Sequence, residues 1–269
     1  MVKARSREKD KILMSALVAT MYVRNVIITD IKEESSGIYT LFFDHAFKFV
    51  PGQYVMVWIR GVDEIPMSLS FANGITVRIV GDATAALCNL APDDTLGIRG
   101  PYGNGFKSTK PPTLLVAGGL GAAPLASYAD ANQARVKTIL GARTKDELLF
   151  VERFKRAGPL LMATDDGSAG RKGSVVDLLR HAHDFGEILC CGPEKMMHAV
   201  WRHALTLGIP CQFSLHRYVK CAIGICGSCC IDASGLRTCV EGPVFAGTQL
   251  GGREFGIYMR DASGRKKEL

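Results

Sequence analysis

The sequence of 269 residues lacks several features that would place it in a simple class. It contains no internal repeat and no low-complexity segment. Its N-terminal apolar run, ILMSALVATMYV at residues 12–23, is too short to span a bilayer and is closed by Arg24. A basic stretch precedes this run, as in a signal peptide, but no A-x-A cleavage site follows it. We therefore expect no membrane association, and we treat residues 1–20 as an N-terminal extension.

The body of the chain also lacks a strong excess of charge. The formal charge is +7, but residues 1–11 contribute +3 and residues 260–269 contribute +2. The +2 that remains is not the basic footprint of a nucleic-acid-binding protein, so we expect no nucleic-acid partner. The basic C-terminal tail is expected to be solvated, with partner docking as the alternative.

Cysteine, in contrast, is abundant, and four of the nine cysteines follow a recognisable spacing within KCAIGICGSCCIDASGLRTC. Four, two and nine residues separate them, and this C-x4-C-x2-C…C order is typical of a plant-type [2Fe–2S] cluster. The glycines between them would let backbone N–H groups approach the sulfides. The predicted cluster ligands are Cys221, Cys226, Cys229 and Cys239.

Two other interpretations of these cysteines are possible. Zinc prefers paired C-x2-C elements, and a disulfide framework needs an oxidising compartment. A cluster fits a reducing interior, which favours a cytoplasmic location. Cys230, beside Cys229, is either a substitute ligand or a small buried side chain.

Hydrophobic patterning divides the chain into further regions. Short β-branched and aromatic runs at residues 23–34, 37–44, 52–60 and 74–81 predict a small antiparallel barrel over residues 21–108. A helix is expected at residues 83–91, with Thr84 as its cap. A strand and a glycine-rich turn, TLGIRGPYGNGF, close this region.

From residue 109 the pattern changes to strands alternating with helices, which predicts a parallel α/β sheet over residues 109–211. Strands are expected at residues 113–119, 136–142, 159–166 and 187–191. Helices are expected at residues 125–133, 148–157, 175–183 and 194–205. Residues 212–269, which carry the four spaced cysteines, are expected to form a small cluster-binding module.

Glycine-rich turns at the ends of the predicted parallel strands indicate a dinucleotide site. In AGGLGAAPL the turn between strand and helix would bring backbone N–H groups to a pyrophosphate. A later turn in CCGPEKMM should reach the same edge of the sheet and form a wall for a nicotinamide. An acidic turn between them either binds ribose hydroxyls or is an ordinary turn. The candidate residues are Gly119, Gly121, Asp165, Asp166, Cys191, Gly192 and Pro193.

The barrel region carries candidate flavin contacts. Pro66 fixes the chain before Ser68, which lies on a predicted strand, and Arg78 lies on a neighbouring one. Thr84 begins a helix whose N-terminal dipole favours a phosphate. Together these residues could hold a flavin and its pyrophosphate.

The order of these motifs resembles the ferredoxin–NADP reductase superfamily, with a flavin barrel followed by a nicotinamide-binding α/β domain. From about Tyr22 to its end, the chain looks more like the electron-transfer subunits of class B (NAD-dependent) dihydroorotate dehydrogenases. The most specific motif is the cysteine run leading into CVEGPVF. Where the superfamily usually has Arg-x-x-Ser for the flavin phosphate, this chain has Ile65 in place of the arginine. The resemblance implies FAD contacts at Ile65, Pro66, Met67, Ser68, Thr76, Val77, Arg78, Ala83 and Thr84.

Without that arginine, the FAD phosphates would depend on Arg78, the Thr84 helix end and Arg99. The resemblance also implies a function. The FMN of a dihydroorotate dehydrogenase catalytic subunit would supply electrons, which would pass through the [2Fe–2S] cluster and FAD to NAD⁺ in pyrimidine biosynthesis, with the two subunits in a heterotetramer. We see no orotate site in this sequence, so residues 215–219 and 242–245 are candidate docking surfaces, or else they pack the cluster module.

Several alternatives remain open from the sequence. One is an NAD(P)H-oxidising subunit of a cytosolic hydrogenase or of a ferredoxin–NADP bifurcating enzyme. A second is a non-catalytic redox sensor, and a third is a zinc-stapled binding protein. Arg143 could accept a 2′-phosphate, which leaves NADP open as the nucleotide.

Overall fold

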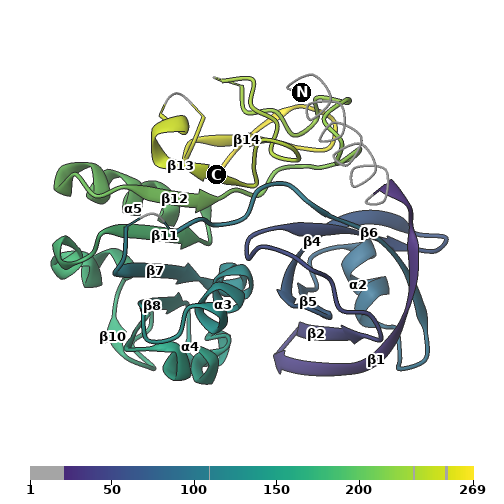
Figure 1. The fold of residues 1–269 in the computed structure, drawn as a ribbon, viewed down its shortest axis with the longest axis horizontal. Helices are drawn as coiled ribbons and strands as arrows, with labels where there is room; N and C mark the ends of the chain where they lie inside the picture. Colours follow the sequence, from purple (N-terminus) through teal and green to yellow (C-terminus); the bar gives the residue numbers. More distant parts are fainter. Residues whose placement is uncertain (1–20, 109, 233, 252–253) are drawn as a thin grey trace, which may run out of the picture.

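A computed structural model of the chain describes residues 21–108, 110–232, 234–251 and 254–269. Figure 1 shows a barrel and an α/β sheet side by side, with the last part of the chain lying along both. No helix of the described residues is long and apolar enough to cross a bilayer.

The first region is a closed antiparallel barrel, as the sequence predicts. Its strand order is β1-β2-β5-β4-β3-β6. β-Branched and aromatic side chains alternate along the strands, and those that point inward form a continuous core that includes Val55, Val57 and Leu69. The strands are β1 (Arg24–Ser35), β2 (Ile38–Phe43), β3 (Tyr54–Ile59), β4 (Asp63–Phe71), β5 (Gly74–Arg78) and β6 (Thr95–Tyr102).

Helix α2 (Asp82–Cys88) follows β5 and lies against the barrel. It begins one residue before the expected start, with Gly81 as its N-cap. Thr84 is therefore the third helical residue and not the cap. Its hydroxyl still accepts hydrogen bonds from the backbone N–H groups of Val80 and Gly81, at 2.9 and 3.0 Å. Thr84 therefore stabilises the turn that precedes the helix, and does so from inside the first helical turn.

The second region is a seven-stranded sheet in the order β10-β9-β8-β7-β11-β12-β13. Every neighbouring pair is parallel except β12 and β13, so the predicted parallel sheet is confirmed with one antiparallel edge strand. The strands are β7 (Thr113–Gly118), β8 (Val136–Ala142), β9 (Leu160–Thr164), β10 (Arg171–Lys172), β11 (Glu187–Cys191), β12 (Cys211–Ser214) and β13 (Val244–Ala246).

Most expected helices of this region are present, with shifted ends. They are α3 (Ala122–Ala131), α4 (Val151–Ala157) and α5 (Glu194–Leu207), with short 3-10 turns η1 (Gly119–Gly121) and η2 (Lys145–Glu147). The helix expected at residues 175–183 is instead a 3-10 helix, η3 (Val175–Asp184). The first turn of η3 has the three-residue hydrogen-bond spacing of a 3-10 helix, because the Asp177 N–H donates to the Ser174 carbonyl. The Asp177 carboxylate in turn accepts a hydrogen bond from the Ser174 N–H.

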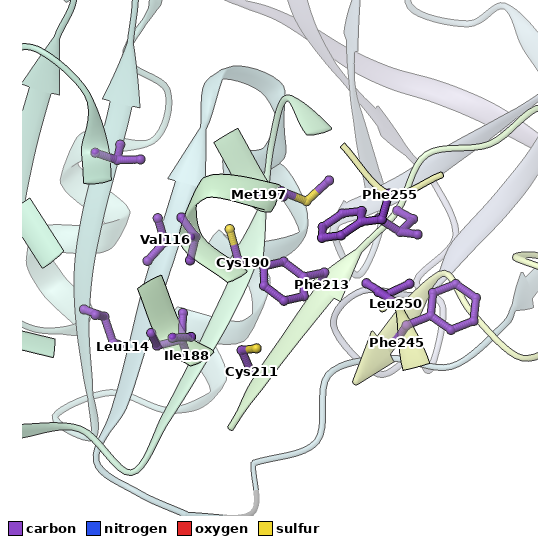
Figure 2. Packing of buried hydrophobic residues seen from close by; sticks show 14 of the residues in the cluster. Leu114, Val116, Ile188, Cys190, Met197, Cys211, Phe213, Phe245, Leu250 and Phe255 are labelled. Atoms are coloured by element: carbon purple, nitrogen blue, oxygen red, sulfur yellow. The ribbon is translucent and has the colours of Figure 1, made fainter. Parts of the chain in front are cut away.

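The cluster segment and the α/β domain share one hydrophobic core. The expected division after residue 211 falls inside β12, and the chain returns through the cysteine run to add β13 to the same sheet. Figure 2 shows Phe213 and Phe255 near Met197 of α5 and Cys190 of β11, and Phe245 beside Leu250 in the same buried cluster. The chain then ends in η4 (Gly247–Gln249) and a hairpin of β14 (Tyr258–Arg260) and β15 (Lys266–Glu268).

Candidate functional site: one cavity between three parts of the chain

A cavity of about 510 Å³ lies where the barrel, the α/β sheet and the C-terminal segment meet. Strands β4 and β5 and helix α2 form one wall, and the turns that follow β7 and β11 form a second. The segment after β12 and the residues around Thr238 complete it. Residues predicted from the sequence that line this cavity are Pro66, Met67, Ser68, Thr76, Arg78, Thr84, Gly119, Gly121, Gly192 and Pro193.

The two glycine-rich turns lie directly against each other at one edge of the sheet. A Cβ atom on Gly121 would lie 2.3 Å from the Cys191 carbonyl oxygen and 2.5 Å from the Gly192 nitrogen. Only a residue without a side chain permits this approach, and Gly119 has a φ of +52° that also favours glycine. The predicted convergence of these turns is therefore present, at the carboxyl ends of parallel strands where ligands bind in such sheets.

A second cavity of about 260 Å³ adjoins the first and shares Arg78, Gly118, Gly119 and Pro193 with it. Arg143, Glu147 and Asp165 line the part that is not shared. The glycine turn that follows β7 therefore lines both cavities.

Arg143 is already paired within this second cavity. Its Nε and Nη2 atoms donate to Glu147 at 3.1 and 2.5 Å, and Arg78 Nη2 lies 4.0 Å from the same carboxylate. The hydrogen bond from Arg143 lowers the pKa of Glu147 and raises the pKa of Arg143. Both guanidinium groups that line the second cavity are thus partly neutralised by one carboxylate.

Five of the predicted cofactor residues line neither cavity. Val77 is fully buried in the barrel core, and Ile65 and Ala83 are partly buried against the same core. Cys191 is also fully buried, and its thiol donates to the Ser214 carbonyl at 3.8 Å. Asp166 instead accepts hydrogen bonds from the hydroxyl and N–H of Ser168.

Arg99 does not reach the cavity, so the expectation that it neutralises the FAD phosphates is wrong. Its guanidinium donates twice to Glu64, at 2.6 and 2.7 Å, and once to the Cys221 carbonyl. The hydrogen bond to Glu64 raises the pKa of Arg99. Arg99 therefore ties the barrel to the cluster segment, and Arg78 is the arginine on the barrel wall of the cavity.

Sequence reasoning missed a buried ion network in the cavity wall. Arg217, which lines the cavity, donates to Glu194 at 2.6 and 3.0 Å and to Glu254 at 3.0 Å. All three side chains are at most 5% exposed. The one available signal was an arginine between Leu215 and Val219, two apolar residues of the segment FSLHRYV. Other lining residues that were not predicted include Tyr54, Met197, Ser214, Leu215, Thr238 and Met259.

The four spaced cysteines form two contacting pairs. Cys221 contacts Cys226, and the Cys239 N–H donates to the Cys229 sulfur at 3.4 Å. Across the described ranges, no three His, Cys, Asp or Glu side chains are grouped as ligands of a single metal ion. Two pairs of thiolates are the arrangement that a two-iron cluster uses, with two protein ligands on each iron. The donor set therefore fits a [2Fe–2S] cluster better than one zinc ion.

The backbone around the cysteines favours thiolates. Burial raises the pKa of the Cys221 thiol, but N–H groups of Cys226, Ile223 and Ile225 outweigh it and lower the pKa to about 6. The hydrogen bond from Cys239 lowers the pKa of Cys229 to about 7 and raises that of Cys239 itself. N–H groups directed at sulfur also stabilise iron-bound thiolates.

The cysteine pairs differ in accessibility. Cys229 and Cys239 are buried beside Tyr54, whose hydroxyl donates to the Cys239 carbonyl at 3.3 Å. Cys226 and its neighbour Ile225, which is 80% exposed, face solvent. The Cys229–Cys239 end of the segment therefore packs on Tyr54, which lines the cavity, and the Cys226 end faces outward.

The docking surfaces expected at residues 215–219 and 242–245 are mostly wrong. Leu215, Val219, Val244 and Phe245 are buried, so these segments pack the module, which was the stated alternative. Of the apolar residues in the two segments, only Tyr218 is exposed. Cys230 is half-buried, and burial raises the pKa of its thiol.

Comparison with known proteins decides the family. Residues 216–251 match the model of the iron-sulfur cluster binding domain of dihydroorotate dehydrogenase B. A probable dihydroorotate dehydrogenase B (NAD(+)), electron transfer subunit, of Methanocella arvoryzae is 53% identical over 81% of this chain and 88% of its own. The chain belongs to this family. The corresponding probable subunit of Methanocaldococcus jannaschii is 46% identical over 89% of this chain and 96% of its own.

Solved structures agree with the family at the level of the fold. A NADH-dependent reduced ferredoxin-NADP oxidoreductase, studied for flavin-based electron bifurcation, is 30% identical with a TM-score of 0.73, over 83% of this chain and 88% of that one. The FAD/NAD-binding domain of a Vibrio cholerae nitric oxide dioxygenase, 20% identical with a TM-score of 0.61, covers 69% of this chain and 94% of that one and shows the fold alone. The predicted barrel, α/β sheet and cluster segment are thus confirmed for this member of the dihydroorotate dehydrogenase B electron transfer family.

Proposed function

We propose that this chain carries electrons from the FMN of a dihydroorotate dehydrogenase catalytic subunit to NAD⁺ in pyrimidine biosynthesis. The observation that carries the proposal is the single cavity bounded by the barrel, the glycine turns and Thr238, which directly precedes the predicted cluster ligand Cys239. A flavin in that cavity would have a nucleotide site on one side and a cluster on the other.

The chemistry requires this order. A nicotinamide exchanges two electrons as a hydride and a [2Fe–2S] cluster exchanges one, whereas FAD can exchange either number, so FAD belongs between them. Overall, dihydroorotate would lose two electrons and two protons, and NAD⁺ would gain a hydride while one proton is released.

Particular residues would hold each group. Arg78 and the start of α2 suit the FAD pyrophosphate, since Arg78 is the arginine on the barrel side of the cavity. Gly119, Gly121, Gly192 and Pro193 would position the NAD⁺, with Asp165 near its ribose. Cys221, Cys226, Cys229 and Cys239 would bind the cluster.

The nucleotide preference follows from Glu147. A 2′-phosphate entering the second cavity would meet the carboxylates of Glu147 and Asp165 and an arginine that is already paired. We therefore propose NAD(H) over NADP(H).

The catalytic subunit would approach the outward end of the cluster segment. Cys226 and Ile225 are exposed there, and the buried pair Cys229 and Cys239 lies behind them. A heterotetramer with two copies of each subunit is the proposed assembly. All nine cysteines are free, which suits a reducing cytoplasm as the proposed location.

The test is co-purification with an FMN-containing dihydroorotate dehydrogenase, followed by dihydroorotate-dependent reduction of NAD⁺. The activity should require both chains and should be lost in Cys226→Ser, while Cys230→Ser, a matched change beside Cys229, should retain it. Activity from the catalytic subunit alone, or from the complex with Cys226→Ser, would contradict the proposal.

A second candidate is the equivalent subunit of a ferredoxin–NADP bifurcating enzyme, favoured by the 30% identity and similar architecture of that structure. If NADH bleaches the flavin of this chain but dihydroorotate never reduces NAD⁺ through the partner, a carrier of this kind is indicated. If NADH does not bleach the flavin, the redox-sensor alternative gains support.

A further inference from the structure

Two hydroxyl groups in the wall of the large cavity have no hydrogen-bond partner among the described residues. They are Oγ of Ser214 and Oγ1 of Thr238. Both residues are 1% exposed, and both line the cavity. A buried hydroxyl without a partner is unfavourable, and most buried polar atoms of native proteins are paired. After rotation about its χ1 bond, either hydroxyl would pair with a polar atom of a ligand in this part of the cavity, so the two residues point to such a ligand.

The backbone holds both residues firmly at the cavity wall. Ser214 ends β12, where it pairs with Cys191 of β11 and Val244 of β13, and its carbonyl accepts the Cys191 thiol. Thr238 N–H donates to the Cys229 carbonyl at 3.1 Å. Each side chain can rotate about one bond, but neither residue can leave the wall without breaking these contacts.

The surroundings of the two hydroxyls suit a flat heteroaromatic ring. Leu215, Val219 and Pro243 line the same C-terminal wall and offer apolar surface. Arg78, in contrast, lies on the wall shared with the second cavity, where a charged pyrophosphate is better placed. An isoalloxazine ring has apolar faces and an edge of nitrogen and carbonyl acceptors that hydroxyl groups can satisfy.

We propose that Ser214 and Thr238 bind the isoalloxazine ring of FAD through their side-chain hydroxyls. This inference rests on the proposed function, because it requires FAD in the large cavity. Thr238 then contacts the flavin through its side chain while its peptide neighbours the cluster ligand Cys239. One residue would link the two redox groups and help to fix the distance between them.

The test uses the full chain without FAD, titrated with FAD and followed by quenching of flavin fluorescence. Loss of one hydrogen bond to the ring in Thr238→Val or Ser214→Ala should weaken FAD binding about fivefold. It should also shift the flavin absorption bands near the visible maximum. Thr238→Ser, which keeps the hydroxyl, should bind FAD within about twofold of the unmodified chain.

Thr138→Val is a matched control. Its Oγ1 atom is also buried without a partner among the described residues, but Thr138 lies on β8 outside both cavities. Removing any of the three unpaired hydroxyls should leave the FAD-free chain as stable as before or more so. Only Thr238→Val and Ser214→Ala should show a smaller rise in melting temperature when FAD is added.

The outcomes separate this inference from the proposed function. If the unmodified chain binds no FAD, the proposed function fails and the inference fails with it. If it binds FAD, but Thr238→Val and Ser214→Ala bind it equally well with unchanged spectra, the hydroxyls do not contact FAD and the inference alone is overturned. If Thr238→Val loses its iron, Ser214→Ala, which lies on β12 outside the cysteine run, decides by the same criterion.

Discussion

Replacing Arg217 by methionine should be among the most damaging single changes in the cavity wall. Arg217 is the one guanidinium that contacts both Glu194 and Glu254, and its side chain is 2% exposed. Arg217→Met would leave two buried carboxylates close together without a cation. Removing one partner of a buried charge pair costs about 3–5 kcal/mol, and here two pairs lose the same partner. We therefore expect a loss near the upper end of that range.

The measurement can be confined to this region, because the chain has only two tryptophans. Trp58 lies on barrel strand β3, and Trp201 of α5 packs against Phe255, next to Glu254. In a Trp58→Phe background, urea unfolding followed by tryptophan fluorescence reports the α/β region alone. The free energy of unfolding should fall by about 5 kcal/mol in Arg217→Met.

A charge-balanced variant tests the cause. Combining Arg217→Met with Glu194→Gln and Glu254→Gln removes all three charges, so most of the lost free energy should return, to within about 1–2 kcal/mol of the unmodified chain. A loss below about 1 kcal/mol in Arg217→Met, or no recovery in the triple variant, would refute the electrostatic reasoning and indicate that packing alone matters.

Three further predictions concern the nucleotide sites and the C-terminal hairpin. Gly121→Ala should weaken NADH binding at least about tenfold, since its Cβ would overlap backbone atoms of Cys191 that cannot move aside. Gly119→Ala, whose Cβ has no neighbour closer than 3.9 Å, should weaken NADH binding less. Equal losses of affinity for the two variants in titrations with NADH would contradict this account. Glu147→Gln should release Arg143 and so raise kcat/KM for NADPH relative to NADH about tenfold. Steady-state kinetics with both nucleotides would measure this ratio, and an unchanged ratio would disprove the prediction. Asp232 accepts two hydrogen bonds from Arg260, which lower its pKa to about 2. Because the folded-state pKa is depressed, this contact stabilises the hairpin above pH about 3.8 and weakens as pH falls toward about 2. Pepsin should therefore cleave the β14–β15 hairpin faster as the pH falls across that window. At pH 7 trypsin should cleave the hairpin faster in Asp232→Asn than in the unmodified chain, but not in Glu268→Gln, which changes an exposed carboxylate on the same hairpin. Equal cleavage rates for the two variants would show that Asp232 does not anchor the hairpin through Arg260.

Local sequence signals predicted much of this molecule. The alternating runs of the barrel and the buried strands of the sheet each depend on short-range patterning, so they were recognisable. Gly119 and Gly121 were recognisable as a turn because tight backbone approach requires glycine. The spacing of the four cysteines carried enough information to predict a cluster before any fold was known.

Features that depend on distant contacts were not accessible in this way. Arg217 meets Glu194 and Glu254 across 23 and 37 residues of sequence, and no local pattern records such a pairing. Arg99 looked available for a phosphate because its partner Glu64 lies on another strand. The docking surfaces failed for a similar reason, because an apolar segment beside a cluster has the same sequence whether it faces a partner or the core.

The strand β13 makes the cysteine run an insertion within the sheet and not an appended module. Phe245 and Phe255, on the far side of the run, fill the same core as Met197 and Cys190. A truncation before the cysteines would thus open the nucleotide domain itself, and the run could not be transplanted onto another reductase as a cassette without rebuilding that core. For the same reason the spacing between the redox groups within this subunit would be inherited from the folded sheet, leaving only the step to the partner subunit free to vary as the two proteins associate.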